Sequence, residues 1–550
     1  MNTTPLRLIP LGGIGDVTKN MYVYEYGNDQ IIVDCGIGFP NDSALGVDVI
    51  IPDITYLETG HKKIHGIILT HGHQDHIGGL PYILPRLPNV PVYGSTLTIA
   101  LAEEKVREFG LTNKMTAVED HLSLGPFNVD FIHVTHSIPN SKHLVIKTPA
   151  GTIYHGADFK FDLTPIDDQP ADFTAIAAAG ARGVDLMLTD CLRIESPGFT
   201  PSERTLLTAI DDEVRTTTGK VIFTTISSSI TRIQMVIESA VRYHRKVVLV
   251  GRSIKQAVEA SAKYGFIKMP KDILVNPENI RHYKPHQLLV VIAGSQGQEG
   301  SAMHRLANDE HKFIKLRPGD HVIVSGDAIP GNESNVFGLI DTLYKKKITV
   351  AYSGSSVNLH VSGHGHRGDL TLLARLVKPK NILPIGGNLR HMVLYQNTMK
   401  DVGYAPEQVP ILEDGQILSL FNHQLKRDGE IEIKNVYVDG LGIGDVGSIV
   451  LRDRQVMASD GMLIAIVPIR RDNGKVSGEI EIVSRGFVYV KESKDLIKQI
   501  QNQVVDCLRT QKGVVTDWAF IRNKIEDALE RFIYKKTERH PLILAVIIEV

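Results

Sequence analysis

The sequence predicts an α/β protein built from several domains, and three observations lead to this prediction. A chain of 550 residues is too long for a single hydrophobic core. Up to about Thr200, short β-rich apolar runs alternate with polar or glycine-rich loops, and beyond it strands alternate with a helix-like segment. The composition, 43% hydrophobic and 22% charged, is typical of globular proteins, so we expect these segments to pack in layers.

The apolar runs before Thr200 predict buried strands, because they have the length and composition of strands rather than helices. Most of them lead into a side chain that can bind a metal ion or a proton. Because strand ends are rigid, they can aim such side chains into one cleft. The runs are LRLIP, QIIVD, IHGIILT, VDFIHVT, TIYHGA and VDLMLT, and the last five lead into Asp34, His71, His136, Asp158 and Asp190.

After Thr200 the order strand, helix, strand predicts a βαβ unit with a parallel sheet. This unit consists of KVIFTT, TRIQMVIESAVRYHR and KVVLVG, and LLVVIAGSQG and DHVIVSGDAIPGN continue the pattern. A further helix and strand follow in DLTLLARLVKPKNILPIGG. Beyond about Gly447 the chain is rich in strands, with a helical portion near DLIKQIQNQVVDCLRTQ. The changes of pattern predict domain boundaries near these two positions.

Charge, cysteine content and hydropathy favour a cytoplasmic protein. Lys+Arg 60 against Asp+Glu 62 gives a net charge of −2, so overall basicity does not indicate a nucleic-acid partner, although acidic surface can offset a basic channel. The 3 cysteines form no disulfide framework, which suits a reducing compartment. The N-terminal residues lack the pattern of a signal peptide, and no apolar stretch reaches the length of about 18 residues that a membrane span needs.

The stretch HGHQDH places His71, His73, Asp75 and His76 directly after an apolar run. This spacing does not form one helical face, and it suits a loop whose side chains converge on an ion. Imidazole and carboxylate groups together are typical ligands of zinc or a similar divalent metal. Asp75 and His76 are adjacent, so we expect them to bind a different ion from His71 and His73, which predicts a two-metal site. The alternative is a polar turn that is rich in histidine.

The motif HGHQDH also resembles the HxHxDH signature of the metallo-β-lactamase superfamily. In that superfamily the remaining ligands follow later strands, and they match His136 in HVTHSIPNS and Asp158 in GADFKFD. The resemblance implies two metal sites with six ligands in all. The first ion is bound by His71, His73 and His136, and the second by Asp75, His76 and Asp158.

A narrower resemblance, to ribonuclease J, extends from the N-terminus to the last residue. The segments that carry it include LGGIGDVTKNMYVYE, FPNDSALGVDVIIPDITYL, GSQGQEGSAMHRLAN, HVSGHG, VDGLGIGDVGSIVLRDR and FIYKKTERHPLILAVIIEV. It implies a metallo-β-lactamase αββα sandwich that is interrupted by a βαβ-type β-CASP domain and followed by a small α/β domain associated with oligomerisation. The implied ranges are 1–205 and 365–447 for the sandwich, 206–364 for the β-CASP domain, and 448–550 for the C-terminal domain.

The same resemblance implies a metal-dependent ribonuclease with 5′-to-3′ exonuclease and endonuclease activity, acting in rRNA processing and mRNA decay. Its substrate would be single-stranded RNA with a 5′-monophosphate, and the protein would form a homodimer or homotetramer. Two zinc ions are the expected cofactors, with manganese or magnesium as alternatives. In this scheme Asp75 orients or deprotonates the attacking water, and His364 is the general acid that protonates the leaving sugar oxygen.

Further residues match functional positions of ribonuclease J. Two loops border the RNA in that family, and the backbone N–H groups of such loops suit phosphate binding. A calcium-like site is implied by two backbone carbonyls and one aspartate. Arg232 and Arg252 are either phosphate contacts or solvated surface residues, and the second interpretation is the more common one for a single arginine. The RNA-binding residues are Ser227, Ser228, Ser229, His360, Val361, Ser362, Gly363 and His364, and the calcium-like ligands are Leu45, Val47 and Asp439.

The chain departs from ribonuclease J where Gly386 stands in place of the histidine that completes the second metal site. Glycine has no ligand atom, so we expect weaker occupancy of that site unless water or the nearby His391 compensates. The family's Ser-Asp-Ser-Thr-Asn stretch is Thr-Asp-Cys-Leu-Arg here and keeps only Asp190. Its Ser-Asn-x-His loop reads Ser-Ser-Ile-Thr and ends at Thr231.

Two other functions compete with the metal-dependent ribonuclease. The loss of a ligand at Gly386 suggests a low-activity, RNA-binding partner subunit of a ribonuclease complex. The superfamily signature alone would also suit a hydrolase of thioesters or lactams. The long βαβ insertion and the SGHG motif argue against that third function.

Overall fold

The computed structural model describes residues 4–41, 43–329, 332–354, 358–473, 475–488, 493–509 and 517–550. It divides into two compact units, one of Met1–Phe39 with Ile50–Val436 and one of Pro40–Val49 with Tyr437–Val550. Among the described residues, every helix is too short or too polar to cross a membrane.

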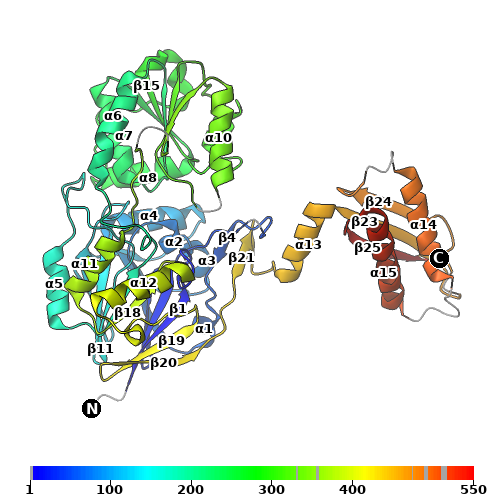
Figure 1. Ribbon diagram of the computed structural model, residues 1–550, viewed down its shortest axis with the longest axis horizontal. Coiled ribbons are helices and arrows are strands. Elements are labelled where there is room, and N and C mark those ends of the chain that lie inside the picture. The colour runs from blue at the N-terminus through cyan, green and yellow to red at the C-terminus, as the bar shows by residue number, and fades with distance from the viewer. Residues whose placement is uncertain are drawn as a thin grey trace. The chain divides into compact units, whose positions relative to one another are not determined.

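The first unit contains a sandwich of two sheets, and both sheets combine strands from distant parts of the chain (Figure 1). The eight-stranded sheet has the order β20-β19-β1-β2-β3-β5-β6-β7 and the six-stranded sheet the order β18-β12-β11-β10-β9-β8. The strands of the first sheet are β1 (Leu6–Gly12), β2 (Met21–Tyr26), β3 (Asp29–Val33), β5 (Lys63–Leu69), β6 (Val92–Gly94), β7 (Met115–Ala117), β19 (Gln416–Phe421) and β20 (Gln424–Glu430). Those of the second are β8 (His121–Leu124), β9 (Phe127–His133), β10 (Lys142–Thr148), β11 (Gly151–His155), β12 (Leu186–Asp190) and β18 (Asn381–Ile385).

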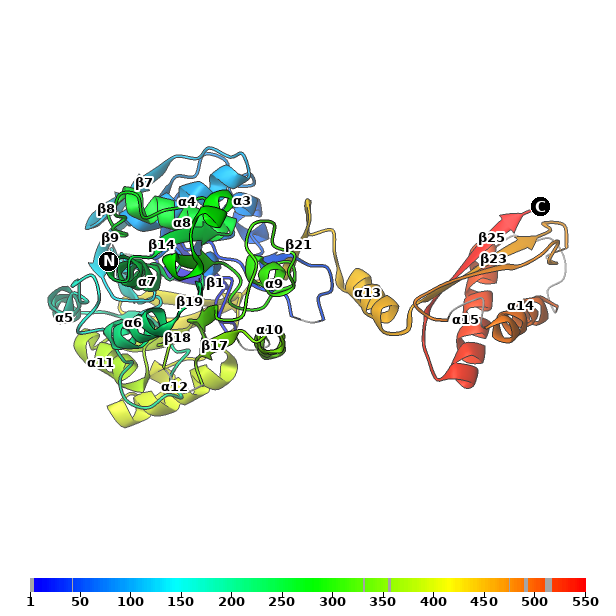
Figure 2. The ribbon, with the colours of Figure 1, turned by 90° about the horizontal axis from the view of Figure 1, so that it is seen from above.

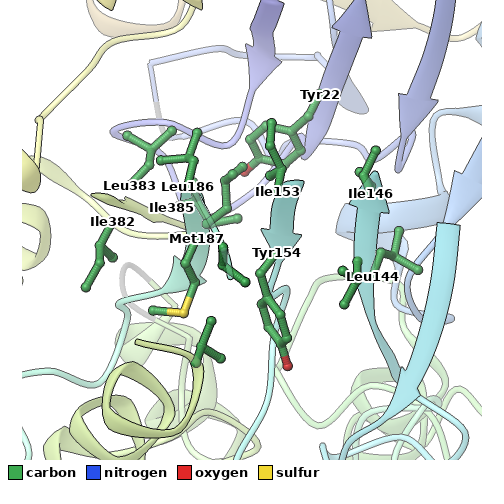
Figure 3. Close-up of a cluster of buried hydrophobic side chains, with 14 of the residues drawn as sticks. Tyr22, Leu144, Ile146, Ile153, Tyr154, Leu186, Met187, Ile382, Leu383 and Ile385 are labelled. Carbon is green, nitrogen blue, oxygen red and sulfur yellow. The ribbon is translucent and has the colours of Figure 1, made fainter. Parts of the chain in front are cut away.

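The core of the sandwich consists of apolar side chains from both sheets. Figure 3 shows Tyr22 of β2 near side chains of β10, β11, β12 and β18, among them Ile153 and Leu186. Leu186 and Met187 are neighbours on one strand and both are fully buried. A strand that is buried on both faces needs a continuous apolar run, which explains the composition of VDLMLT.

Helices cover the outer faces of the two sheets, which gives the predicted αββα layers. Beside the six-stranded sheet lie α5 (Phe173–Arg182), α11 (Arg367–Val377) and α12 (Leu389–Val402), visible together in Figure 1. The other helices of this part are α1 (Thr55–Thr59), α2 (Gln74–Ile77), α3 (Leu80–Ile83) and α4 (Thr96–Glu108), of which α4 packs on β6 and β7. Two 3₁₀ helices are η1 (Glu203–Thr205) and η4 (Pro406–Gln408).

The chain between the strands β12 and β18 contains a separate, fully parallel sheet of order β14-β15-β13-β16-β17. Alternate residues of its strands face two different cores: Val221 and Phe223 face α6, α7 and α8, whereas Ile222 faces α9 and α10. The strands are β13 (Val221–Thr224), β14 (Lys246–Val250), β15 (Leu288–Ile292), β16 (His321–Val324) and β17 (Thr349–Tyr352). The helices are α6 (Leu206–Thr216), α7 (Ile230–Arg242), α8 (Arg252–Lys263), η2 (Pro277–His282), η3 (Pro285–Gln287), α9 (Ala302–Ala307) and α10 (Glu333–Lys345). The predicted βαβ insertion is therefore confirmed.

The second unit has a small α/β fold. Its sheet has the order β24-β23-β25, in which β23 pairs parallel with β25, and the two strands lie side by side in Figure 2. One face of this sheet packs against α14 and α15, while Leu544, Val546 and Ile548 on β25 are exposed. The elements are α13 (Ser448–Asp460), β23 (Met462–Ile469), β24 (Glu481–Arg485), α14 (Lys494–Leu508), α15 (Trp518–Thr537) and β25 (Leu542–Glu549), and the short strands β21 (Val436–Asp439) and β22 (Gly442–Ile443) precede them. The short strand β4 (Val49–Ile51) spans a boundary between the two units in the sequence.

Candidate metal centre

The HGHQDH loop begins where β5 ends and continues into α2. Its backbone is fixed against the residues after β3, because Cys35 N donates to His76 O at 2.7 Å and Gly79 N donates to Cys35 O at 2.8 Å. A Cβ atom on Gly36 would lie 1.6 Å from the carbonyl oxygen of Asp75, so only glycine fits there. These close contacts hold the ligand side chains of the loop in one orientation.

His71, His73, His136 and Asp158 each place a ligand atom within 4.8 Å of the others. His73 Nδ1 lies 3.1 Å from both His71 Nε2 and His136 Nε2. Asp158 Oδ2 lies 3.8 Å from His71 Nε2 and 3.9 Å from His136 Nε2. His136 follows β9 and Asp158 follows β11, so two strands of one sheet bring them to the loop after β5.

The second nitrogen of each of these three imidazoles has a partner from the chain, and this fixes which nitrogen points inward. If each outer nitrogen donates its hydrogen, the three inward nitrogens all present lone pairs to a common point. The outer contacts are His71 Nδ1 to Thr70 Oγ1 at 3.1 Å, His73 Nε2 to Ser137 Oγ at 3.3 Å and His136 Nδ1 to Gly363 O at 2.7 Å.

Electrostatics agree with this donor set. Burial lowers the pKa of His71 and His136 well below the usual value, and that of His73 to about 3, so the rings are neutral. Four ligand atoms at 2.0–2.1 Å from a tetrahedral ion are about 3.4 Å apart, which is close to the spacing observed here. Neutral imidazoles, a carboxylate and this spacing fit a divalent cation such as zinc.

A second group consists of Asp75, His76 and Asp158, and Asp158 belongs to both groups. His76 Nε2 lies 3.7 Å from Asp75 Oδ2 and 3.4 Å from Asp158 Oδ2. On its other side, His76 Nδ1 lies 2.7 Å from Asp34 Oδ2. Burial lowers the pKa of His76, but Asp34, Asp158 and Asp75 together raise it well above its usual value. A cation between these carboxylates would replace that proton.

Asp34 contacts the candidate metal centre, although its sequence pattern indicated no specific role for it. It follows β3 in the left-handed conformation at φ 61°, which aspartate tolerates better than most residues. Its carboxylate also accepts from Thr70 N at 2.8 Å, so it orients both His76 and the start of the HGHQDH loop. The only sequence signal was its position at the end of a strand.

Gly386 lies beside the shared carboxylate, at the end of β18. A Cβ atom there would be 3.7 Å from Asp158 Oδ1 and 3.8 Å from Asp190 Oδ1, so a longer side chain would start next to the carboxylate that the two groups share. His391 does not take this place. Its Nδ1 accepts from Asn388 N at 3.2 Å at the start of α12, and its Nε2 is 3.5 Å from Glu195 Oε2.

His364 stands next to both groups. Its Nδ1 lies 2.8 Å from Asp190 Oδ2 and 3.9 Å from Asp158 Oδ2. Burial lowers the pKa of His364, but these two carboxylates raise it to about 9. The ring is thus protonated at neutral pH and can donate a proton next to the candidate metal site.

The residues expected to bind RNA lie on two loops of the first unit. Ser227, Ser228 and Ser229 precede α7, and the His360–Gly363 stretch leads to His364. Ser229, Val361, Ser362 and Gly363 are buried, whereas Ser227, Ser228 and His360 are partly exposed. Their contacts with RNA remain a prediction. For Arg232 the solvated interpretation was wrong, because the side chain is buried, while Arg252 is exposed.

The expected calcium-like ligands lie in the second unit. Leu45 O accepts from Arg454 Nη1 at 2.9 Å, and Asp439 Oδ2 accepts from Arg454 Nη2 at 2.6 Å. Val47 is buried and packs against Leu451 in a small apolar cluster. In this structure the guanidinium of Arg454 therefore binds both the Leu45 carbonyl and the Asp439 carboxylate, where a calcium ion was expected. The calcium-like site stays a prediction.

A cavity of about 470 Å³ lies within the first unit, between the sandwich and the inserted domain. Its lining includes Lys142 and His133 on one side and Tyr264, Phe266 and Thr231 on the other. A smaller adjoining pocket shares His133 and Thr231 and reaches His136. The larger cavity is therefore connected to the candidate metal centre only through this small pocket.

Comparison with known proteins finds a matching protein family for each of the three parts of the chain. The family models that match are the metallo-beta-lactamase superfamily at residues 14–193, the ribonuclease J beta-CASP domain at 218–343 and the ribonuclease J C-terminal domain at 449–550. Ribonuclease J 1 of Streptococcus pyogenes is 37% identical over 98% of this chain and 96% of its own length. Ribonuclease J2 of Bacillus subtilis is 35% identical over 100% and 99%, and ribonuclease J of Thermus thermophilus 37% identical over 99% and 95%.

Among solved structures, a protein of unknown function from Enterococcus faecalis aligns with a TM-score of 0.54 and 18% identity. The alignment covers 76% of this chain and 100% of that chain, and it supports the fold alone.

Proposed function

This chain belongs to the ribonuclease J family of RNA-hydrolysing enzymes, and we propose that it is a metal-dependent ribonuclease that cleaves single-stranded RNA as a 5′-to-3′ exonuclease and as an endonuclease. The observation that carries the proposal is the convergence of the inward nitrogens of His71, His73 and His136 on Asp158, next to His364. A role in rRNA processing and mRNA decay follows from the same proposal.

His71, His73, His136 and Asp158 would hold one divalent cation, and Asp75, His76 and Asp158 a second. Zinc fits the imidazole-rich first site, and manganese or magnesium suits the carboxylate-rich second site better than the first. When bound, such ions lower the pKa of water and stabilise negative charge on the attacked phosphate.

The chain's own residues supply the proton transfers. Asp75 accepts a proton from the attacking water, whose oxygen forms the new bond to phosphorus. As the bond from phosphorus to the sugar oxygen breaks, His364 donates its proton to that oxygen. Asp190 holds His364 through the 2.8 Å contact and favours its protonated form.

The substrate would enter between the sandwich and the inserted domain. The partly exposed Ser227 and Ser228 and the backbone near Gly363 supply polar groups for phosphate oxygens, which suits a 5′-monophosphorylated end. The cavity of about 470 Å³ is large enough for a nucleotide, and its Tyr264 and Phe266 offer aromatic faces for a base, while the smaller adjoining pocket leads from it to His136.

The protein would act in the cytoplasm as a homodimer or homotetramer. The exposed apolar residues Leu544, Val546 and Ile548 on one strand of the C-terminal sheet support self-association.

The test compares wild type with His76→Ala on 5′-monophosphorylated single-stranded RNA, after the proteins are loaded with zinc or manganese. The variant should lose about 100-fold or more of the cleavage rate. His121→Ala is the control, since His121 is a surface residue with 53% of its side chain exposed. Equal cleavage by wild type and His76→Ala would mean that the active site lies elsewhere. A wild type that binds RNA without cleaving it would instead be a partner subunit.

A further inference from the structure

Among the residues that the structure describes, Arg232 is the most extensively hydrogen-bonded buried side chain that the proposed reaction does not use. It lies on α7 and is 2% exposed. A guanidinium has five N–H groups, and each of those of Arg232 has an acceptor. The contacts are Nε to Glu203 Oε2 at 3.1 Å, Nη2 to Glu203 Oε1 at 3.0 Å and to Val361 O at 2.6 Å, and Nη1 to Ser325 O at 3.2 Å and to His360 Nδ1 at 2.8 Å.

All of these acceptors except Ser325 come from the two places where the chain passes between the sandwich and the inserted domain. Glu203 belongs to η1, just before the inserted domain begins, and Val361 lies just before the chain re-enters the sandwich. Ser325 follows β16 inside the inserted domain. One side chain thus joins the outgoing segment, the returning segment and the inserted sheet.

Glu203 is itself anchored to the sandwich. Lys160 Nζ lies 3.4 Å from Glu203 Oε1, and Glu203 N donates to Asp162 Oδ2 at 2.9 Å. Burial raises the pKa of Glu203, but Arg232 and Lys160 lower it below its usual value, so the carboxylate is ionised. The position of Arg232 is therefore fixed by charge as well as by hydrogen bonds.

The returning segment carries the groups that touch the candidate metal centre. Two residues after Val361, the carbonyl of Gly363 accepts from His136 Nδ1 at 2.7 Å. One residue further, His364 meets Asp190. Consecutive Cα atoms are about 3.8 Å apart, so the place of Val361 limits where these two groups can stand.

We propose that Arg232 is a positioning residue for the reaction. By bonding His360 and Val361, it holds the returning segment so that the Gly363 carbonyl orients His136 and the His364 ring stands against Asp190. The inference rests on the proposed ribonuclease function, since it assigns Arg232 a part in that reaction.

Arg245 provides a matched comparison, because it is also a buried arginine of the inserted domain, at 4% exposure. Its guanidinium donates to the carbonyl oxygens of Gly219, Leu288 and Val214, all within that domain. These bonds leave the returning segment untouched, so Arg245 represents a purely structural buried arginine.

The test uses Arg232→Lys and Arg245→Lys in the full-length, metal-loaded protein. Lysine keeps the charge, so neither variant leaves a buried carboxylate without a cation, but it cannot bond Glu203 and Val361 together. We expect Arg232→Lys to lower kcat on RNA by about 100-fold with KM within about threefold, because misplaced reacting groups slow the chemical step. Arg245→Lys should change kcat by less than about threefold.

Hydrogen exchange of residues 358–366 gives a second readout that does not depend on activity. It should speed up in Arg232→Lys and not in Arg245→Lys. Glu203→Gln provides a variant for the case that Arg232→Lys does not fold, and it should show the same pattern in weaker form. Similar kcat losses and similar exchange in the Arg232 and Arg245 variants would overturn the inference. If wild type itself failed to cleave RNA, the proposed function would fail, and the exchange comparison alone would decide whether Arg232 holds this segment.

Discussion

At the scale of single residues, Gly386 decides how many side chains the second ion can use. We expect the wild type to retain one ion tightly and to lose the second on mild dialysis, because Asp75, His76 and Asp158 are the side chains that gather there in the described part of the chain. Gly386→His should retain both, since its side chain would start 3.7 Å from Asp158 Oδ1. Histidine tolerates the left-handed φ of +62° better than most residues.

Metal per chain, measured by mass spectrometry after dialysis, checks this prediction. Gly386→Ala is the control, because it also places a Cβ atom at this left-handed position and adds no ligand atom. Two ions held tightly by the wild type would show that three protein side chains suffice.

The proposed proton donor gives a second prediction at this scale. His364→Ala should lower the rate of RNA cleavage by about 100-fold or more, because the sugar oxygen is a poor leaving group without a proton. The same variant should cleave bis(p-nitrophenyl) phosphate nearly as well as wild type, since nitrophenolate leaves unprotonated. Steady-state rates on both substrates check the prediction. A similar loss on both would assign His364 to binding or to structure instead.

The residues of the site differ in how far the sequence predicted them. His71, His73, Asp75 and His76 are close in the sequence, so their spacing alone indicated a common site. His136 and Asp158 needed the resemblance to a known family, since nothing local distinguishes them from other polar residues after strands. The structure brings all six together, although their roles as ligands stay a prediction.

The partners of Asp34 and Arg232 were beyond sequence reasoning for a physical reason. Asp34 meets His76 from 42 residues away, and Arg232 meets Val361 from 129 residues away. Such contacts depend on the order of strands and on the path of the inserted domain. Composition and periodicity describe only local structure, so a buried arginine and a solvated one give the same local pattern.

At the scale of elements, the long apolar strands were predictable and the short or distant ones were not. KVIFTT and VDLMLT became β13 and β12, whereas three-residue strands such as β6 and β7 leave little periodicity to detect. The pairing of β1 with β19 joins Leu6 to Leu420. Only the expectation of a split sandwich, which came from the resemblance to ribonuclease J, indicated that such distant segments would share a domain.

The start of α4 offers a prediction about pH. Glu119 accepts from Thr96 N at 2.9 Å and lies 2.8 Å from Lys142 Nζ. Burial raises its pKa, but Lys142 and Thr96 lower it to about 2. Because the pKa of Glu119 is lower in the folded state, these bonds stabilise the folded start of α4 at pH values above the unfolded-state pKa of about 4.3. The stabilisation is lost as the pH falls toward 2 and the carboxylate takes up a proton. The carboxylate is 41% exposed, so solvent screens the effect and we expect a local rather than a global change.

Hydrogen exchange of α4, corrected for the intrinsic effect of pH, measures this change. In wild type the protection of residues 96–99 should fall between pH 4.5 and pH 2, about the range set by the two pKa values. In Glu119→Gln the protection of these residues should be low already at neutral pH. Glu103→Gln, within α4 itself, should behave like wild type. Equal protection in Glu119→Gln and wild type at neutral pH would mean that this carboxylate does not stabilise the helix.

At the scale of the whole molecule, we expect the C-terminal sheet to determine whether the chain associates. Its edge strand β25 exposes Leu544 at 41%, Val546 at 45% and Ile548 at 47%, while Ala545 between them faces the core. An edge strand also carries backbone N–H and C=O groups that can pair with another strand. Apolar side chains beside a free edge are costly to leave in water, which favours a second copy of this chain as the partner.

A single charge on this face should therefore dissociate the oligomer without unfolding the domain. Val546→Asp places a carboxylate among apolar side chains at the expected interface, where its desolvation opposes association. We expect light scattering coupled to size exclusion to give the mass of a dimer or tetramer for wild type and 60.7 kDa, the monomer mass, for the variant. Asn502→Asp adds the same charge at an exposed position of α14 and should leave the mass unchanged. The candidate metal centre lies in the other unit, so the Val546→Asp protein should bind as much metal as wild type. A wild type that is monomeric in solution would contradict self-association through this face.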